Sequence, residues 1–193
     1  MLRFRGDRLP PWVVPAAVPG YAPRMATTTP PDHEPALHRQ LLPAFLFDTD
    51  QPKLLYILKA WLLAFIPSIG LAGLVTWLAP EPPAPDFGGT GPGVAFAVVI
   101  FAPVVETLLM TPPVLILNRL LGPSAAILGS AILWGFLHSW AEPLWGLIIW
   151  WPFLVLSAVL LAWREKGLGI AMAMVIAVHA MQNLIPGMTL LLG

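Results

Sequence analysis

Long apolar runs occupy most of the chain after about residue 54, and they constrain the fold more than any other feature. Hydrophobic residues make up 58% of the 193 positions and charged residues only 10%, whereas a soluble domain carries about 25% charged residues. Several runs exceed the roughly 20 residues that cross a bilayer as a helix, and the alternating short strands of a membrane barrel are absent. The sequence therefore predicts an all-α, polytopic transmembrane helical bundle. Its five predicted spans cover about 60–78, 94–117, 123–140, 144–163, and 168 to an interruption at Pro186-Gly187.

The basic residues indicate how these spans are oriented. Every Lys and Arg lies either before the first span or in the loops that follow the second and fourth spans. Because Lys and Arg mark the cytoplasmic side, this pattern predicts the N-terminus in and the C-terminus out. We therefore expect a multi-pass protein of the inner cell membrane, in contact with the lipid bilayer. The formal net charge is zero, so nothing indicates nucleic acid as a partner, and the lack of cysteine excludes disulfides and thiolate chemistry.

The first 50 residues differ from the rest of the chain. They are rich in proline, and "PPWVVPAAVPGYAPR" has no periodic pattern, so residues 1–50 are predicted to be a disordered N-terminal region. No basic stretch is followed by an uninterrupted apolar one, as a signal peptide requires. "MATTTPPDHEP" is typical of an ordinary polar N-terminus and suggests Met25 as the natural start. "LHRQLLPAFLF" is predicted to lie on the membrane surface, before a transmembrane domain at 54–193.

Few strongly polar residues remain inside the predicted spans. An ionisable side chain at the bilayer centre costs about 2.5–3.5 kcal/mol on insertion scales, so such residues usually face the protein interior and mark function. Three titratable residues on three different helices therefore predict a shared functional site. The polar residues are Glu106 in the second span, His138 in the third, and His179, Gln182 and Asn183 in the fifth.

Local spacing supports this prediction. His179 and Asn183 are four residues apart, so they share one face of a helix. Pro103 precedes Glu106 and two further prolines follow it. Proline frees backbone carbonyls and bends a helix locally. A bent helix around a carboxylate favours a water-filled cavity over a wall that faces lipid.

Each of these residues also has a structural explanation. Glu106 alone could be a protonated carboxylic acid that donates one hydrogen bond. His138 lies near the outer end of its span, from which an imidazole can extend to the interface. His179 and Asn183 could join helices through hydrogen bonds worth about 0.6 kcal/mol each. Gln182 lies off their shared face and is assigned to that joining role.

Small residues recur at four-residue spacing in the third and fifth spans. In the third span Ala131 and Gly135 form one row, next to the pair Ala125 and Gly129, and in the fifth span Gly169, Ala173 and Ala177 form the other. Such rows let helix backbones approach closely in lipid. We expect both rows to be packing surfaces, and the first lies on the same face as His138.

Three short motifs follow one another along the second, third and fifth spans: "PVVETLLMT" with Glu106, "WGFLH" ending at His138, and "HAMQN" from His179 to Asn183. In these motifs the chain resembles the CPBP intramembrane proteases, the CAAX protease and bacteriocin-processing family. That family's pattern is Glu-Glu-x-x-x-Arg after a proline, then Phe-x-x-x-His, then His-x-x-x-Asn. The resemblance covers about 94–186. It implies hydrolysis of a peptide bond in a membrane-associated peptide or protein, lipidated or not.

The chain departs from the family pattern at three positions. Thr107 stands where the second glutamate belongs, Thr111 where the arginine belongs, and Trp134 replaces the phenylalanine. Loss of the arginine removes a charge partner that could orient the carboxylates. The alternative function is therefore a catalytically impaired pseudo-protease that binds a membrane peptide or a partner, for example in bacteriocin immunity.

The expected chemistry uses all four motif residues. Glu106, assisted by His138, takes a proton from water, and His179 and Asn183 donate hydrogen bonds to the oxyanion. The zinc-dependent alternative has Glu106, His138 and His179 as ligands. It would leave no general base, because Thr107 is not a carboxylate, so the metal-free version is preferred. A third class of function is a proton or ion pathway through the same three titratable residues.

Overall fold

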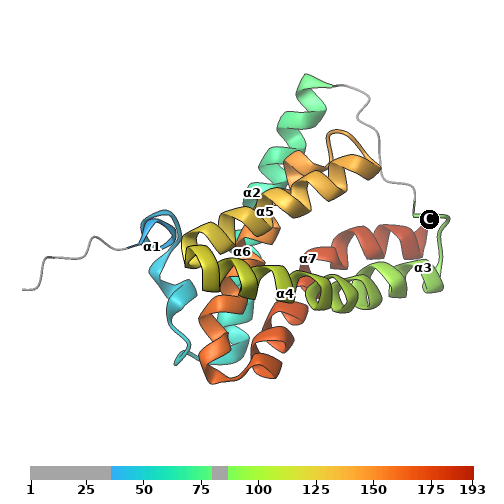
Figure 1. Cartoon of the computed structure of the whole chain (residues 1–193). Coiled ribbons are helices and arrows are strands. Elements are labelled where there is room, and N and C mark those ends of the chain that lie inside the picture. Colours follow the sequence, from blue (N-terminus) through green and yellow to red (C-terminus); the bar gives the residue numbers. More distant parts are fainter. Residues whose placement is uncertain (1–35, 80–86) are drawn as a thin grey trace, which may run out of the picture. The chain divides into compact units, whose positions relative to one another are not determined.

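The computed structural model describes residues 36–79 and 87–193, and all regular elements within these ranges are helical (Figure 1). Five helices are long and apolar enough to cross a membrane, as the sequence predicts, so the chain is a multi-pass membrane protein. Four of them are single helices: α2 (Lys53–Leu78), α5 (Pro123–Ala141), α6 (Gly146–Trp163) and α7 (Leu168–Leu192). The second along the chain is continuous but has three parts, namely α3 (Pro92–Phe96), the π-helical turn η2 (Ala97–Phe101) and α4 (Ala102–Leu121). Short elements are α1 (Leu37–Leu41) and the 3-10 turns η1 (Ala44–Phe47) and η3 (Arg164–Lys166).

Residues 36–50 are folded, which corrects the disorder predicted up to residue 50. Burial of apolar residues and long-range hydrogen bonds hold this segment in place. Leu46 is fully buried, and the Tyr56 hydroxyl donates to its carbonyl at 2.8 Å. His38 is also buried and contacts Ser124 at the start of α5. The prediction for residues 1–35, including the start at Met25, lies outside the described residues.

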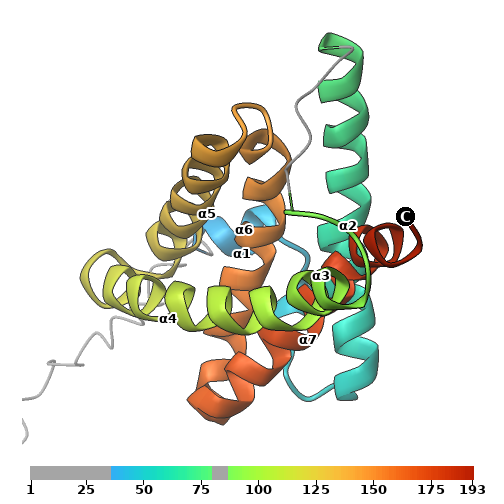
Figure 2. The ribbon, with the colours of Figure 1, turned by 90° about the vertical axis from the view of Figure 1, so that its right-hand side faces the viewer.

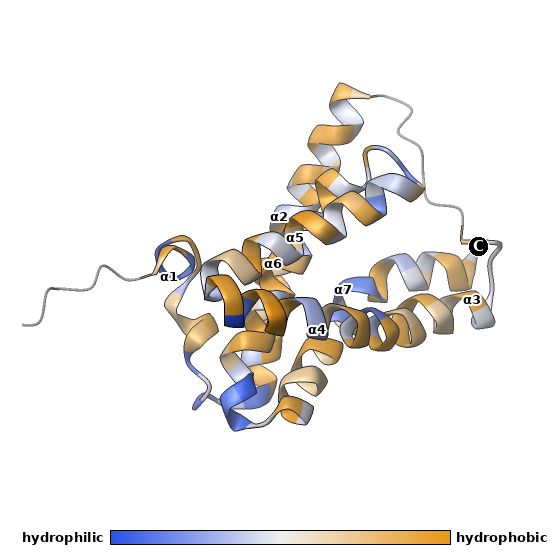
Figure 3. Cartoon of the chain, in the orientation of Figure 1, coloured by the Kyte–Doolittle hydropathy of each residue, from blue (hydrophilic) through white to orange (hydrophobic). Residues whose placement is uncertain are grey.

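Helix α6 lies at the centre of the bundle and packs against α2, α4, α5 and α7 (Figure 2). In its most apolar window 61% of the residues are buried, against 22–33% in the other four long helices. A helix that is hydrophobic on all sides belongs in the interior. The other long helices carry apolar residues on their outward faces as well (Figure 3), as helices surrounded by lipid do.

Helices α5 and α6 approach most closely at two glycines. A Cβ on Gly146 would collide with the Gly135 carbonyl oxygen, and a Cβ on Gly135 would lie 3.0 Å from that of Trp150. Ala131, one turn earlier, is buried. The row that begins at Ala131 is thus a packing surface, and this prediction is confirmed.

The row at Gly169 and Ala173 is not a packing surface, and this prediction is wrong. Ala173 and Gly169 are both exposed, and nothing lies within 4 Å of a Cβ built on Gly169. Helix α7 instead buries Ala171, Val175 and Val178. Small residues permit close packing, but the larger apolar side chains of α7 decide which face is buried.

The interruption predicted at Pro186-Gly187 is absent, because α7 continues through it to Leu192. Membrane helices tolerate proline where neighbouring groups compensate for the lost hydrogen bond. Here the end of α7 is held against the start of α3, since the Gly91 N–H donates to the Leu190 carbonyl at 2.7 Å. Gly187 is buried and lets the Val99 side chain approach, since a Cβ at 187 would collide with it.

Candidate functional site

Glu106 and His179 meet where α4 packs against α7. The Glu106 Oε2 atom lies 3.5 Å from His179 Nε2, and the two side chains are 23% and 6% exposed. A carboxylate only accepts hydrogen bonds, so its position favours the neutral His179 tautomer with the proton on Nε2. The other ring nitrogen, Nδ1, is buried and has no hydrogen-bond partner among the described residues.

The turn that precedes α4 explains the position of Asn183. Pro103 has no N–H, and the chain before it forms a π-helical turn in which the Ala102 N–H donates to the Ala97 carbonyl. In an α-helix the Ala102 N–H would instead donate to the Val98 carbonyl. In a π-helix the donor to that carbonyl would be the N–H of residue 103, which proline lacks. The Val98 carbonyl is therefore left without a backbone donor. Asn183 supplies the missing hydrogen bond, because its Nδ2 donates to the Val98 carbonyl at 3.0 Å.

These contacts change the expectation for His179 and Asn183. The sequence predicted that both side chains donate to a single oxygen. In the structure each already has its own neighbour, Glu106 for His179 and Val98 for Asn183. The Asn183 amide nitrogen carries two hydrogens, so one of them is still available to a ligand.

His138 is enclosed by aromatic rings rather than extended toward the interface, which does not fit the structural explanation given above. Its ring centroid lies 5.1 Å from that of Trp145 and 5.5 Å from that of Phe153. Its Nδ1 lies 2.8 Å from the Trp134 carbonyl. Because a carbonyl only accepts, Nδ1 must carry the proton, and Nε2 is left as an acceptor.

The four motif residues line one cavity of about 790 Å³, a volume in the range of ligand sites. Glu106 comes from α4, His138 from α5, and His179 and Asn183 from α7. Phe153 of α6 stands between the two histidines, with its ring centroid 5.5 Å from each of theirs. A smaller cavity of about 490 Å³ also has Glu106 and His138 in its wall. The structure therefore brings the predicted residues together.

Sequence reasoning missed several residues that also line the larger cavity. Gln182, assigned to joining helices, lies in its wall, and its Oε1 is buried without a partner among the described residues. Ser68 of α2 contributes a hydroxyl that donates to Ala64 O at 2.7 Å. Gln182 could have been included, because it lies only three residues from His179. The lining aromatic residues carry no motif that separates them from other membrane aromatics.

The two threonines at the departures from the family pattern line neither cavity that contains Glu106. Both are buried, and the Thr111 hydroxyl donates to the Thr107 carbonyl at 2.7 Å. The Thr107 hydroxyl has no partner in the described part of the chain. Glu106 therefore lies next to the His179 imidazole, without a second carboxylate from position 107.

The residues present do not form a ready metal site. Within 36–79 and 87–193, no group of three or more His, Asp or Glu side chains is arranged to hold a metal ion. Catalytic zinc takes three protein ligands and a water. Glu106, His138 and His179 share a cavity, but they are not a preformed ligand set, so the geometry gives no support to the zinc alternative.

Comparison of the chain with protein-family models, with curated proteins and with solved structures finds no match. The geometry of the cavity and the three motifs are therefore the features from which a function can be inferred.

Proposed function

We propose that the chain is an intramembrane endopeptidase of the CPBP type, located in the inner cell membrane with its N-terminus in the cytoplasm. One observation carries the proposal: the Glu106 carboxylate lies 3.5 Å from the His179 imidazole on the wall of a cavity of about 790 Å³ between membrane helices. Hydrolysis of a peptide bond needs a base, hydrogen-bond donors for an oxyanion, and room for the substrate and a water. The cavity offers all of these.

Glu106 is the proposed general base. It takes a proton from a water molecule, whose oxygen then attacks the carbonyl carbon of the substrate peptide bond. His138 orients this water, because the contact of its Nδ1 with the Trp134 carbonyl leaves Nε2 as an acceptor.

His179 and Asn183 are the proposed donors to the oxyanion. Addition of water turns the substrate carbonyl oxygen into an alkoxide. Once Glu106 has taken the water proton, its carboxyl group no longer holds the His179 Nε2–H, which donates to this alkoxide together with the free amide hydrogen of Asn183. The bond to Val98 fixes the Asn183 amide before the substrate arrives. Collapse of the intermediate breaks the C–N bond, and the proton held by Glu106 passes to the departing amine.

The test compares the wild type with Glu106→Gln in lipid nanodiscs, using fluorogenic membrane peptides with and without a prenyl group. We expect at least about a 100-fold loss of cleavage, the contribution of a positioned general base. Asp48→Asn, an exposed carboxyl-to-amide change outside the cavity, is the matched control and should cleave normally. Equal cleavage by Glu106→Gln and the wild type would remove the proposal. Loss of wild-type cleavage on adding a chelator would favour the zinc version instead.

A second candidate function is peptide binding without cleavage. It is favoured by the absence of a second carboxylate at Thr107 and by the engagement of Asn183 with Val98. In that case a labelled apolar peptide binds the wild type and Glu106→Gln equally, and mass spectrometry detects no product from either.

A further inference from the structure

A separate pocket of about 460 Å³ lies at the end of the bundle where α4 ends, α5 begins and α6 ends. The basic residues of the described ranges gather at this end, together with Asp48, Asp50 and Glu165. Figure 3 shows the resulting hydrophilic patches near α1 and at the turn between α6 and α7. The basic residues are Arg39, Lys53, Lys59, Arg119, Arg164 and Lys166.

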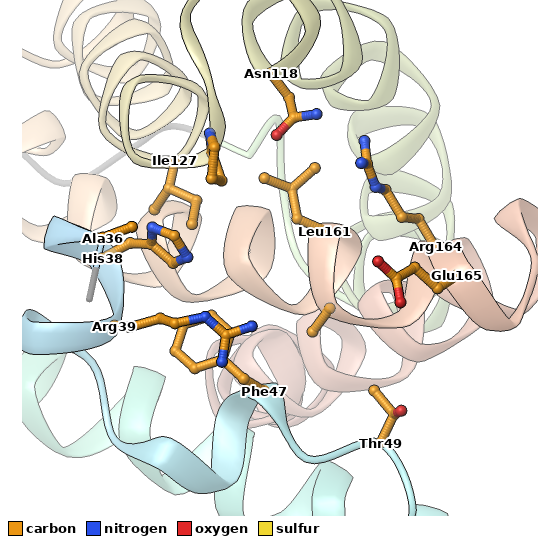
Figure 4. A pocket seen from close by; sticks show the side chains of 12 residues that line it. Ala36, His38, Arg39, Phe47, Thr49, Asn118, Ile127, Leu161, Arg164 and Glu165 are labelled. Carbon is orange, nitrogen blue, oxygen red and sulfur yellow. The ribbon is translucent and has the colours of Figure 1, made fainter. Parts of the chain in front are cut away.

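Two arginines reach this pocket from different elements. Arg39 comes from α1, and Arg164 from the turn after α6 (Figure 4). The Arg39 guanidinium carbon lies 4.8 Å from the centre of the Phe47 ring, a contact that holds the group in place and leaves its N–H donors free. In the described ranges neither arginine forms an ion pair: the one between a Lys or Arg and a carboxylate there is Lys166–Asp50, and the contact of Glu106 is with the neutral His179.

Neutral groups in the same wall complete a site suited to an anion. The Asn118 amide and the Thr49 hydroxyl line the pocket, and α5 begins there at Pro123, so the positive end of its helix dipole is at the wall. Glu165 is the one carboxylate in the lining. Two guanidinium groups with a helix N-terminus match a phosphate, since guanidinium binds phosphate in a bidentate fashion.

Exposed apolar residues beside the pocket favour a lipid over a soluble phosphate compound. Leu37 and Leu41 flank Arg39 on α1 and are 48% and 61% exposed. Leu120 and Leu121, just after Asn118 on α4, are 70% and 67% exposed. Apolar side chains at the ends of membrane helices, next to basic ones, are the surface that acyl chains and charged headgroups cover together.

We propose that this pocket binds the phosphate of an anionic membrane lipid, with Arg39 and Arg164 as its ligands and the leucines of α1 against the acyl chain. Basic pockets between membrane helices bind such headgroups. Glu165 weakens the binding by repulsion. A bound lipid would also join α1 to the ends of α4 and α6. This site is independent of the function proposed for the cavity at Glu106.

The test uses the full chain in nanodiscs and native mass spectrometry of retained phosphatidylglycerol against phosphatidylcholine. The double variant Arg39→Gln/Arg164→Gln should lose at least about tenfold in phosphatidylglycerol affinity. The control Lys53→Gln/Arg119→Gln removes the same charge at the same end outside the pocket lining, and it should stay within about twofold of the wild type. Equal losses in the two double variants, or no loss in the first, would overturn the proposal.

Glu165→Gln keeps the proposal testable if the double variant fails to fold. Removing this carboxylate should raise the affinity for phosphatidylglycerol, and an unchanged or lower affinity would contradict the site. Inorganic phosphate and glycerol 3-phosphate distinguish a soluble ligand. If either compound raises the unfolding temperature of the wild type as much as phosphatidylglycerol does, the lipid is not the ligand.

Discussion

The cavity at Glu106 and the pocket at Arg39 differ in how their polar groups are satisfied. In the cavity, two polar contacts join different helices, since Glu106 lies 3.5 Å from His179 and Asn183 donates to the Val98 carbonyl, while His179 Nδ1 and Gln182 Oε1 are buried without a partner among the described residues. In the pocket, the guanidinium groups of Arg39 and Arg164 have no ion-pair partner among the described residues. Helix ends reach water and lipid headgroups, whereas the middle of a membrane helix has only protein to bond with.

Because of this difference, the same type of polar contact is expected to contribute different amounts to the free energy of unfolding at the two places. An unpaired polar group deep in the bundle cannot turn to water, so loss of its partner leaves the full desolvation cost. An exposed group at the helix ends recovers most of that cost from solvent. Removing a polar contact should therefore lower the free energy of unfolding more when the contact lies deep in the bundle than when it lies at the exposed helix ends.

The largest effect is expected at Asn183. Replacing it with leucine leaves the Val98 carbonyl without a donor, which should lower the free energy of unfolding by about 1–3 kcal/mol. Pro103→Ala supplies a backbone N–H, so the cost of Asn183→Leu should be smaller in that background. Unfolding in mixed micelles measures both. The control on the same helix is Gln182→Leu, an amide-to-apolar change at a side chain whose Oε1 has no hydrogen-bond partner among the described residues. Equal costs in both backgrounds would contradict the link between Pro103 and Asn183.

A smaller effect is expected in the contact between α5 and α6. The Ser157 hydroxyl lies 2.8 Å from the Ser130 hydroxyl and 2.7 Å from the Phe153 carbonyl, and all three are buried. Ser157→Ala should lower the free energy of unfolding by about 1 kcal/mol. Because the two hydroxyls form one contact, adding Ser130→Ala should cost less than it does alone. Additive losses would show that the hydroxyls act separately.

A pH-dependent effect is expected at the basic end. Burial, and secondarily the charge of Arg39, lower the pKa of His38 below its ordinary 6.5. Between the two pKa values the unfolded chain binds more protons than the folded one, so the free energy of unfolding falls as the pH drops below about 6.5. His38→Asn should flatten unfolding curves between pH 7 and pH 5, a range of about two units around that pKa. If the free energy of unfolding of this variant still falls between pH 7 and pH 5, the pH dependence comes from groups other than His38.

The smallest effect is expected for the exposed pair Lys166–Asp50, whose charged atoms lie 2.7 Å apart. The hydrogen bond and charge of Lys166 lower the pKa of Asp50, so any contribution is present above the ordinary pKa of aspartate and is lost as the pH falls through the lowered value. Solvent and salt screen such a pair. Lys166→Ala should therefore leave the unfolding transition unchanged at physiological salt, and a clear loss would break the ranking.

The sequence predicted the five spans and the residues that meet in the cavity for physical reasons. Apolar runs of bilayer length have few folds available. Polar residues within such runs must face inward. Glu106, His138, His179 and Asn183 could therefore be placed in one cavity before their neighbours were known.

The remaining features depend on contacts between residues far apart in the chain. The partner of Asn183 could not be predicted, because Val98 loses its donor only through the turn before Pro103. Pro186-Gly187 was expected to interrupt the last span, but α7 continues to Leu192, where the Gly91 N–H just before α3 donates to the Leu190 carbonyl. Residues 36–50 were predicted to be disordered, and the contacts of Leu46 with Tyr56 and of His38 with Ser124, which the local sequence does not reveal, hold them in place.

If the cavity receives a substrate from the bilayer, as proposed above, the bond between Asn183 and Val98 limits the sides from which that substrate can approach Glu106. Separating α7 from η2 would break this hydrogen bond and expose the Val98 carbonyl to acyl chains, so we expect α7 and η2 to stay in contact. Helix α2 lines the cavity through Phe65 and Ala72, yet it packs mainly on α6 and α7, and η2 packs on α3, α4 and α7. The side between α2 and η2 is thus the one that can widen without breaking a backbone hydrogen bond described above, and it is where a lateral gate from the membrane would form.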